Sequence, residues 1–277
     1  MEHAKAKIVT IPEPTSSETA INLDRRIVAA GLAGLVILAA VYTAVNIGLV
    51  PSATNMTAAG DALAAPAQWP RLNTAGVFLM WWIMLIAMLV PSAAPMILLY
   101  TVLKRRHPRL PPWRHPLLLS LTFLAGYLAV WAAFAAAMTA LQAMLTQMQL
   151  LTPALQIKGP LISGAIFLAA GLYQFSQLKK ACLAQCQSPI RFLTKRRRHG
   201  NRGAWRMGLE HGAICLGCCG GLMLLLFAGG VLNFFWIAGL AVFVSVEKLL
   251  PGGRRFGRYV AILLCGIGLG WIIFPDF

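Results

Sequence analysis

The sequence predicts an all-α protein, a polytopic bundle of transmembrane helices. Of its 277 residues, 58% are hydrophobic and only 12% are charged, and the mean hydropathy is +0.71. About a quarter of the residues in an ordinary soluble chain are charged, so this composition excludes a water-soluble globule. The apolar residues also gather in blocks of about 20, each long enough to cross the ~30 Å hydrocarbon core of a bilayer at ~1.5 Å per residue.

Seven apolar blocks predict about seven spans within one helical domain, residues 25–277. They lie at about residues 27–50, 72–103, 117–147, 159–178, 207–228, 232–250 and 259–275. The leader, residues 1–24, cannot bury apolar surface and is expected to be disordered in the cytoplasm. The first block follows Arg25 and Arg26 as a signal peptide would. Its apolar run of about 24 residues exceeds the 7 to 15 of a signal peptide, so we interpret it as an anchor.

The second block carries four methionines and two prolines. Met80, Met84 and Met88 recur at i, i+4 spacing and form one stripe, and Met96 follows Pro91 and Pro95. Such a stripe is usually packing, but thioethers are also ligands that a Cu(I) path would use. Each proline removes a backbone donor and clashes one turn back, which predicts a kink in this helix.

The fourth and fifth blocks differ in character. The fourth becomes polar after Tyr173 and is expected to leave the bilayer by Gln177. The fifth is rich in glycine, which predicts close helix contact. Its glycines are Gly208, Gly212, Gly217, Gly220, Gly221, Gly229 and Gly230.

Basic residues predict the orientation of the spans. Of 24 Lys and Arg, four precede the first span, five lie between the second and third, nine between the fourth and fifth, and four between the sixth and seventh. All of these fall on one side if the spans alternate, and only Arg71 and Lys158 lie opposite. The positive-inside rule therefore predicts a cytoplasmic N-terminus and an outward-facing C-terminus.

Five cysteines and a histidine gather where the fourth and fifth spans meet the cytoplasm. Cys182 and Cys186 have i, i+4 spacing, which places them on one helical face. His211, Cys215 and Cys218 form a second stripe, with Cys219 on its shoulder. A reducing compartment disfavours structural disulfides there. A sixth cysteine, Cys265, stands alone in the seventh span and is expected to be a small packing residue.

These thiols and the imidazole predict a metal site. The two spans are consecutive and antiparallel, so the two groups enter the membrane at similar depth and could close around one ion. Soft thiolates suit Cu(I) and Zn(II), and we rank Cu(I) first. Glu210 and Glu247 lie at the same face. We expect Glu210 to neutralise the positive N-terminus of the fifth span and Glu247 to pair with Lys248 or Arg254. The alternative is second-shell or occasional first-shell ligation, with a carboxylate orienting His211.

Several of these segments resemble a bacterial family of predicted metal-binding integral membrane proteins. They are residues 80–96 (MWWIMLIAMLVPSAAPM), 169–174 (AAGLYQ), Cys182, Cys186, 188–189 (SP), 206–212 (RMGLEHG), 215–219 (CLGCC) and 247–251 (EKLLP). The resemblance extends from about residue 75 to 255 and implies metal binding in a membrane. Leu85 and Leu89 stand where similar sequences lead us to expect further methionines.

The leading hypothesis is a multi-pass protein of the bacterial inner membrane that binds Cu(I) or Zn(II) for transport or delivery. Its partners would be anionic headgroups at the basic loops and a protein that gives or accepts metal; we expect no nucleic acid. The chain has no nucleotide loop, G-x-S-x-G or H-E-x-x-H motif, so an enzyme is disfavoured. The alternatives are a thiol oxidoreductase or assembly factor using Cys182 and Cys186 against Cys215 and Cys218, and a scaffold subunit of a membrane complex.

Overall fold

The computed structural model describes residues 74–105, 116–196, 198, 200–250 and 252–274, with the single positions 30, 33 and 37. The predicted leader, nearly all of the predicted first span and residues 275–277 lie outside the described residues. Within them the protein is helical, and the only β pairing in the described ranges is an isolated bridge between Leu151 and Ile157. The all-α prediction is confirmed for this part of the chain.

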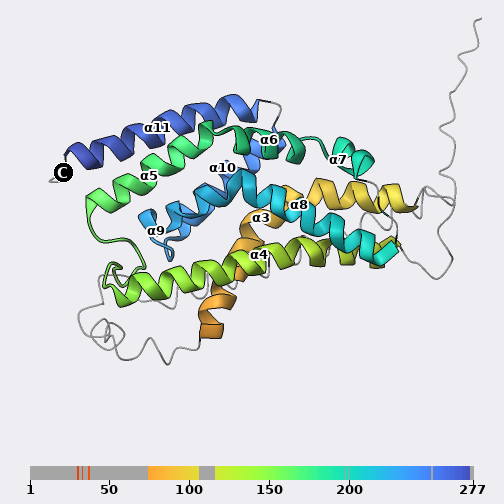
Figure 1. Cartoon of the computed structure of the whole chain (residues 1–277), viewed down its shortest axis with the longest axis horizontal. Helices are drawn as coiled ribbons and strands as arrows, with labels where there is room; N and C mark the ends of the chain where they lie inside the picture. The colour runs from red at the N-terminus through yellow and green to blue at the C-terminus, as the bar shows by residue number, and fades with distance from the viewer. Residues whose placement is uncertain are drawn as a thin grey trace, which may run out of the picture.

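In the described ranges, nine helices follow the order of the predicted blocks (Figure 1). They are α3 (Thr74–Arg105), α4 (Pro116–Gln147), α5 (Pro160–Phe175), α6 (Gln177–Cys186), α7 (Pro189–Lys195), α8 (Gly200–Met223), α9 (Leu225–Gly229), α10 (Phe234–Leu249) and α11 (Gly253–Ile273). The second and third predicted spans correspond to α3 and α4. The fourth is divided between α5 and α6, and the fifth, sixth and seventh correspond to α8 with α9, α10 and α11.

Four of these helical segments are long and apolar enough to cross a membrane: α3, α4, α8 with α9, and α11. The pair α5 and α6 would make a fifth span, but it is bent by 65° at Ser176. Helix α10 has 16 residues, or about 24 Å at 1.5 Å per residue, which is shorter than the hydrocarbon core. The described residues therefore hold four or five candidate spans, and the count of seven and the orientation stay predictions.

Helix α3 runs without a break through Pro91 and Pro95. Figure 1 shows it change direction between its orange first half, which crosses α4, and its yellow second half, which runs on past α8. This is the kink that the two prolines predict. Ser92, between them, donates its hydroxyl to the carbonyl of Leu89 at 2.8 Å.

The break between α5 and α6 falls where the sequence becomes polar. Ser176 is the N-cap of α6, and its hydroxyl accepts a hydrogen bond from the backbone N–H of Lys179 at 3.1 Å. Because this cap starts a new helix in a new direction, α6 packs across α8 instead of continuing the line of α5. The thiols of α6 are thereby brought against α8.

Glycines allow α8 and α4 to approach each other closely, as predicted for the fifth span. A Cβ at Gly208 would lie 2.1 Å from the carbonyl oxygen of Phe123, and one at Gly212 would lie 2.9 Å from Val130. Helices α5 and α11 meet in the same way, with Gly171 against the sulfur of Cys265. In both pairs a glycine lies where the two helices approach each other most closely.

Candidate metal centre

Three thiols of α8 form a compact cluster inside the bundle. The sulfurs of Cys215, Cys218 and Cys219 all lie within 4.8 Å of one another, and all three residues are buried. Cys218 and Cys219 donate their thiol protons to the carbonyl oxygen of Cys215, at 3.1 and 3.0 Å. Cys219 was predicted only at the shoulder of the stripe, and the structure places it within the cluster.

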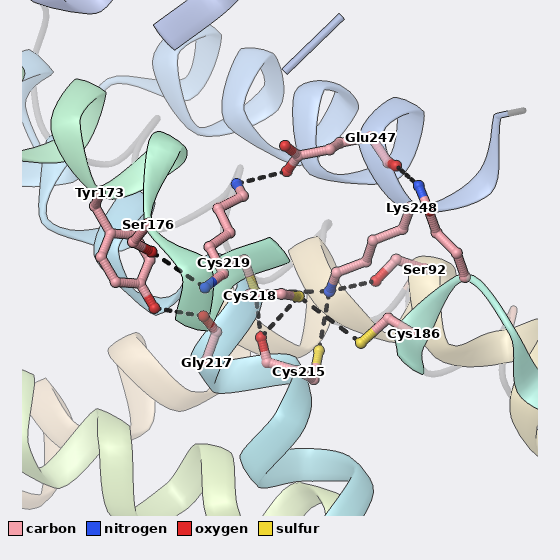
Figure 2. Close-up of polar contacts among 12 residues, drawn as sticks. Ser92, Tyr173, Ser176, Cys186, Cys215, Gly217, Cys218, Cys219, Glu247 and Lys248 are labelled. Atoms are coloured by element: carbon pink, nitrogen blue, oxygen red, sulfur yellow. Dashed lines mark hydrogen bonds and ion pairs between the residues drawn. The ribbon is translucent and has the colours of Figure 1, made fainter. Parts of the chain in front are cut away.

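A fourth sulfur reaches the cluster from α6. The Sγ atom of Cys186 lies 3.8 Å from that of Cys218 (Figure 2). When four thiolate sulfurs surround one ion tetrahedrally at a metal–sulfur distance of about 2.3 Å, neighbouring sulfurs are about 3.8 Å apart. The spacing of these two sulfurs therefore fits a shared soft metal ion.

Cys182 occupies a different position. It lies one turn before Cys186 on α6, and its sulfur is 2.8 Å from the point where a side chain on Gly217 would begin. Next to it, the Tyr173 hydroxyl donates a hydrogen bond to the carbonyl of Gly217. Of the two α6 thiols that the spacing placed on one face, Cys186 is the one whose sulfur lies within hydrogen-bond distance of a cluster sulfur in the described residues.

The ammonium group of Lys248 lies among the sulfurs, which the sequence analysis did not foresee. It donates hydrogen bonds to Cys215 Sγ at 2.9 Å, Cys219 Sγ at 3.6 Å and Ser92 Oγ at 3.4 Å (Figure 2). The residue is only 6% exposed. Lys248 was counted as a loop charge, whereas its side chain is directed into the bundle from the end of α10. A lysine that directly follows the apolar stretch of a helix is the signal that could have indicated it.

Glu247 has a different partner from those expected. Its carboxylate pairs with the ammonium of Lys179 at 2.7 Å, and both side chains are almost fully buried. Neither Lys248 nor Arg254 forms an ion pair with Glu247. Adjacent residues on a helix point about 100° apart, so the side chain of Lys248 turns toward the thiols instead. The backbone carbonyl of Glu247 also accepts a hydrogen bond from Gln187 at 2.8 Å. Glu247 thus joins α10 to α6 beside the cluster.

Glu210 faces outward from α8 toward the chain after α7. Its two carboxylate oxygens pair with Arg196 at 2.8 Å and Arg198 at 2.7 Å. The suggested contact between Glu210 and the imidazole of His211 is absent from the hydrogen bonds of the described residues, because neighbours on a helix do not face each other. Glu210 therefore fastens the loop before α8 instead of orienting the imidazole.

His211 is buried among aromatic rings on the side of α8 that faces α4. Its ring lies 5.7 Å from that of Tyr127, 6.0 Å from Phe123 and 5.4 Å from Phe192. Its Nδ1 atom has no hydrogen-bond partner among the described residues. The Tyr127 hydroxyl lies 3.3 Å from Cys215 Sγ. Tyr127 thus lies against both the imidazole ring and a thiol of the cluster.

A cavity of about 240 Å³ opens onto this cluster. Its walls include residues of five helices and combine thiol, thioether, imidazole and ammonium groups. They include Ser92, Met96, Cys186, His211, Cys215 and Lys248. The kinked segment of α3, the thiols and the lysine therefore share one space.

The predicted methionine stripe faces the interior of the bundle. Met84, Met88 and Met96 are buried, and Met80 is half-buried and packs against the core. Among these four, only Met96 lines the cavity beside the thiols. The thioethers are therefore enclosed by protein over about four turns of α3.

One known protein family matches most of the chain. A family model described as the copper chaperone PpoB2 matches residues 78–271. The chain belongs to this copper chaperone family. No curated protein and no solved structure matches the chain.

The copper chaperone match includes every candidate ligand described above. It extends from the methionine stripe of α3 to the end of α11, and so includes the thiols of α6 and α8 and the lysine of α10. It also agrees with the resemblance to a metal-binding bacterial family, which was based on residues 75 to 255. The predicted first span and leader lie before the matched residues.

Proposed function

We propose that this protein of the copper chaperone family binds Cu(I) as its cargo in the membrane and passes it on. The observation that supports this most strongly is the meeting of Cys186 from α6 with the three thiols of α8, beside a cavity. Soft thiolates are the ligands that Cu(I) prefers. Zinc would suit the same sulfurs and ranks second.

The proposed ligands are Cys186, Cys215 and Cys218, with Cys219 and His211 within reach of the same space. Cys182 is not among the proposed ligands, because its sulfur lies against Gly217. Deprotonated thiols are costly in an apolar interior unless a cation accompanies them. Cu(I) and the ammonium of Lys248 both supply positive charge, which makes this buried set of sulfurs suitable for the ion.

The row of methionine thioethers along α3 supports the proposal that the protein passes the ion on. Met96 lines the cavity, and Met88, Met84 and Met80 continue from it along the enclosed face of the same helix. A thioether holds Cu(I) by a single soft donor and so suits transient binding better than a thiolate cluster. An acceptor or donor protein at the membrane face would complete the transfer.

We place the protein in the bacterial inner membrane as a multi-pass, non-enzymatic protein with a cytoplasmic N-terminus. Four or five described helical segments have the length and apolarity for this. The basic loops would contact anionic headgroups. Arg202 and Arg206, exposed beside Trp205 at the start of α8, suit that contact.

The test is the metal content of full-length protein purified anaerobically in detergent after growth with copper. Wild-type protein should carry about one copper per chain, and Cys215→Ser/Cys218→Ser should carry none. Cys265→Ser is the matched control, because that lone thiol packs against Gly171 away from the cluster. Equal copper in the double variant and in the control would reject the proposed site.

A thiol oxidoreductase is the second candidate, and the contact between Cys186 and Cys218 favours it. The two thiols would become a disulfide by losing two electrons and two protons to a disulfide substrate, which would be reduced to two thiols. Metal-free wild-type protein with a disulfide that reforms after reduction would support this candidate over copper binding.

A further inference from the structure

Lys248 contributes a fixed positive charge to the metal site. Its ammonium lies 2.9 Å from Cys215 Sγ and is shielded from solvent. An ion bound by that sulfur would lie within a few ångströms of this charge. Interactions between charges at such distances are strong in a buried setting, where water does not screen them.

No carboxylate forms an ion pair with this ammonium in the described part of the chain. It donates hydrogen bonds to Cys215, Cys219 and Ser92. Glu247 is adjacent in sequence but pairs with Lys179. The ammonium of Lys248 therefore donates to two sulfurs and one hydroxyl, and none of these acceptors is a carboxylate.

We propose that Lys248 makes the site selective for a monovalent over a divalent ion. For any fixed set of thiolates, a neighbouring ammonium opposes a divalent ion by one unit charge more than it opposes a monovalent ion. This difference of one unit charge is the same whether two or three of the thiols are deprotonated. This inference rests on the proposed copper site and names the residue that separates Cu(I) from Zn(II).

The test measures Cu(I) and Zn(II) affinities of full-length protein in detergent, by competition with a chromophoric chelator for each ion. Lys248→Met removes the charge, and we expect the ratio of Cu(I) to Zn(II) affinity to fall about tenfold or more. Lys248→Arg keeps the charge and should keep the ratio close to that of wild type. Lys180→Met, which removes an exposed lysine of α6, is the control and should leave the ratio unchanged.

A second variant keeps the lysine and neutralises it. Ser92 Oγ lies 3.4 Å from Lys248 Nζ, so Ser92→Asp would place a carboxylate beside the ammonium at the half-exposed cavity wall. It should lower the affinity ratio in the same direction as Lys248→Met, and it tests the proposal even if that variant does not fold.

The outcomes separate this inference from the proposed function. Wild-type protein that binds no Cu(I) would reject both. Wild-type protein that binds Cu(I), with an unchanged affinity ratio in Lys248→Met or in Ser92→Asp, would reject the role of Lys248 alone. A fall in the ratio for Lys248→Arg as large as for Lys248→Met would also reject it, because charge would then not be the cause.

Discussion

The sulfurs of Cys186 and Cys218 lie 3.8 Å apart, although helices α6 and α8 carry them and 31 residues separate them in the sequence. Cys182, one turn earlier on α6, lies against Gly217. Two thiols with equivalent spacing in the sequence are therefore not equivalent in the fold, because the bend at Ser176 sets which turn of α6 meets the cluster.

Cys186→Ser and Cys182→Ser should consequently differ in their effect on copper. The first removes a proposed ligand and should weaken Cu(I) binding by about a hundredfold or more, because losing even a group that only orients a ligand costs about 10–100-fold. The second should change the affinity by less than about threefold. Competition with a chromophoric Cu(I) chelator measures both. A larger loss in Cys182→Ser would contradict the assignment of Cys186 as the α6 ligand.

The helices and the cysteine cluster of α8 could be predicted because they depend on local patterns. The apolar blocks predict α3, α4 and α11. The spacing of Cys215 and Cys218 places their side chains on one face of any helix. The kink of α3 and the glycine-mediated contact of α8 also follow from residue chemistry. These features need no knowledge of which helices are neighbours.

The remainder depends on tertiary contacts that no local pattern specifies. Lys248 was assigned to a loop because topology rules treat lysine as a surface charge, and only the packing of α10 against α3 brings it to Ser92 and Cys215. The pairing of Glu247 with Lys179 joins residues 68 positions apart. Helix α10 was also predicted as a full span, although its helical part is only 16 residues long.

The ion pair between Lys179 and Glu247 should be costly to break from one side. Lys179→Met would leave a buried carboxylate without its partner and lower the free energy of unfolding by about 3–5 kcal/mol. Lys179→Met/Glu247→Met should recover most of that loss, since no buried charge is left unpaired. Thermal unfolding in detergent measures the three proteins side by side. A double variant no more stable than Lys179→Met would show that the pair does not act as a unit.

The close contact of α8 with α4 predicts a steric effect at Gly208. A Cβ there would meet the backbone of Phe123, which cannot move aside as a side chain can, so Gly208→Ala should lower stability by about 1–3 kcal/mol. Gly266→Ala on α11 is the control, because open space surrounds that position. The comparison uses thermal unfolding in detergent, and similar stability of the two variants would argue against the packing described for α8.

Met96 is predicted to act in loading the site. Met96→Leu keeps a similar volume and removes the thioether that lines the cavity beside the thiols. The rate of Cu(I) uptake from a chelated donor should fall severalfold, while the Cu(I) affinity at equilibrium stays within about threefold of wild type. Stopped-flow absorbance measures uptake, and Met144→Leu, at an exposed position of α4, is the control. Unchanged uptake in Met96→Leu would exclude this route.

The most direct test of the copper site is X-ray absorption at the copper edge of anaerobically loaded, full-length protein. A cluster of Cys186, Cys215 and Cys218 predicts Cu(I) with sulfur as the dominant first-shell scatterer, and this signal should be lost in Cys215→Ser/Cys218→Ser. A first shell made only of nitrogen and oxygen in the wild-type protein, or a sulfur shell that persists in the double variant, would contradict the thiol cluster as the site of copper binding.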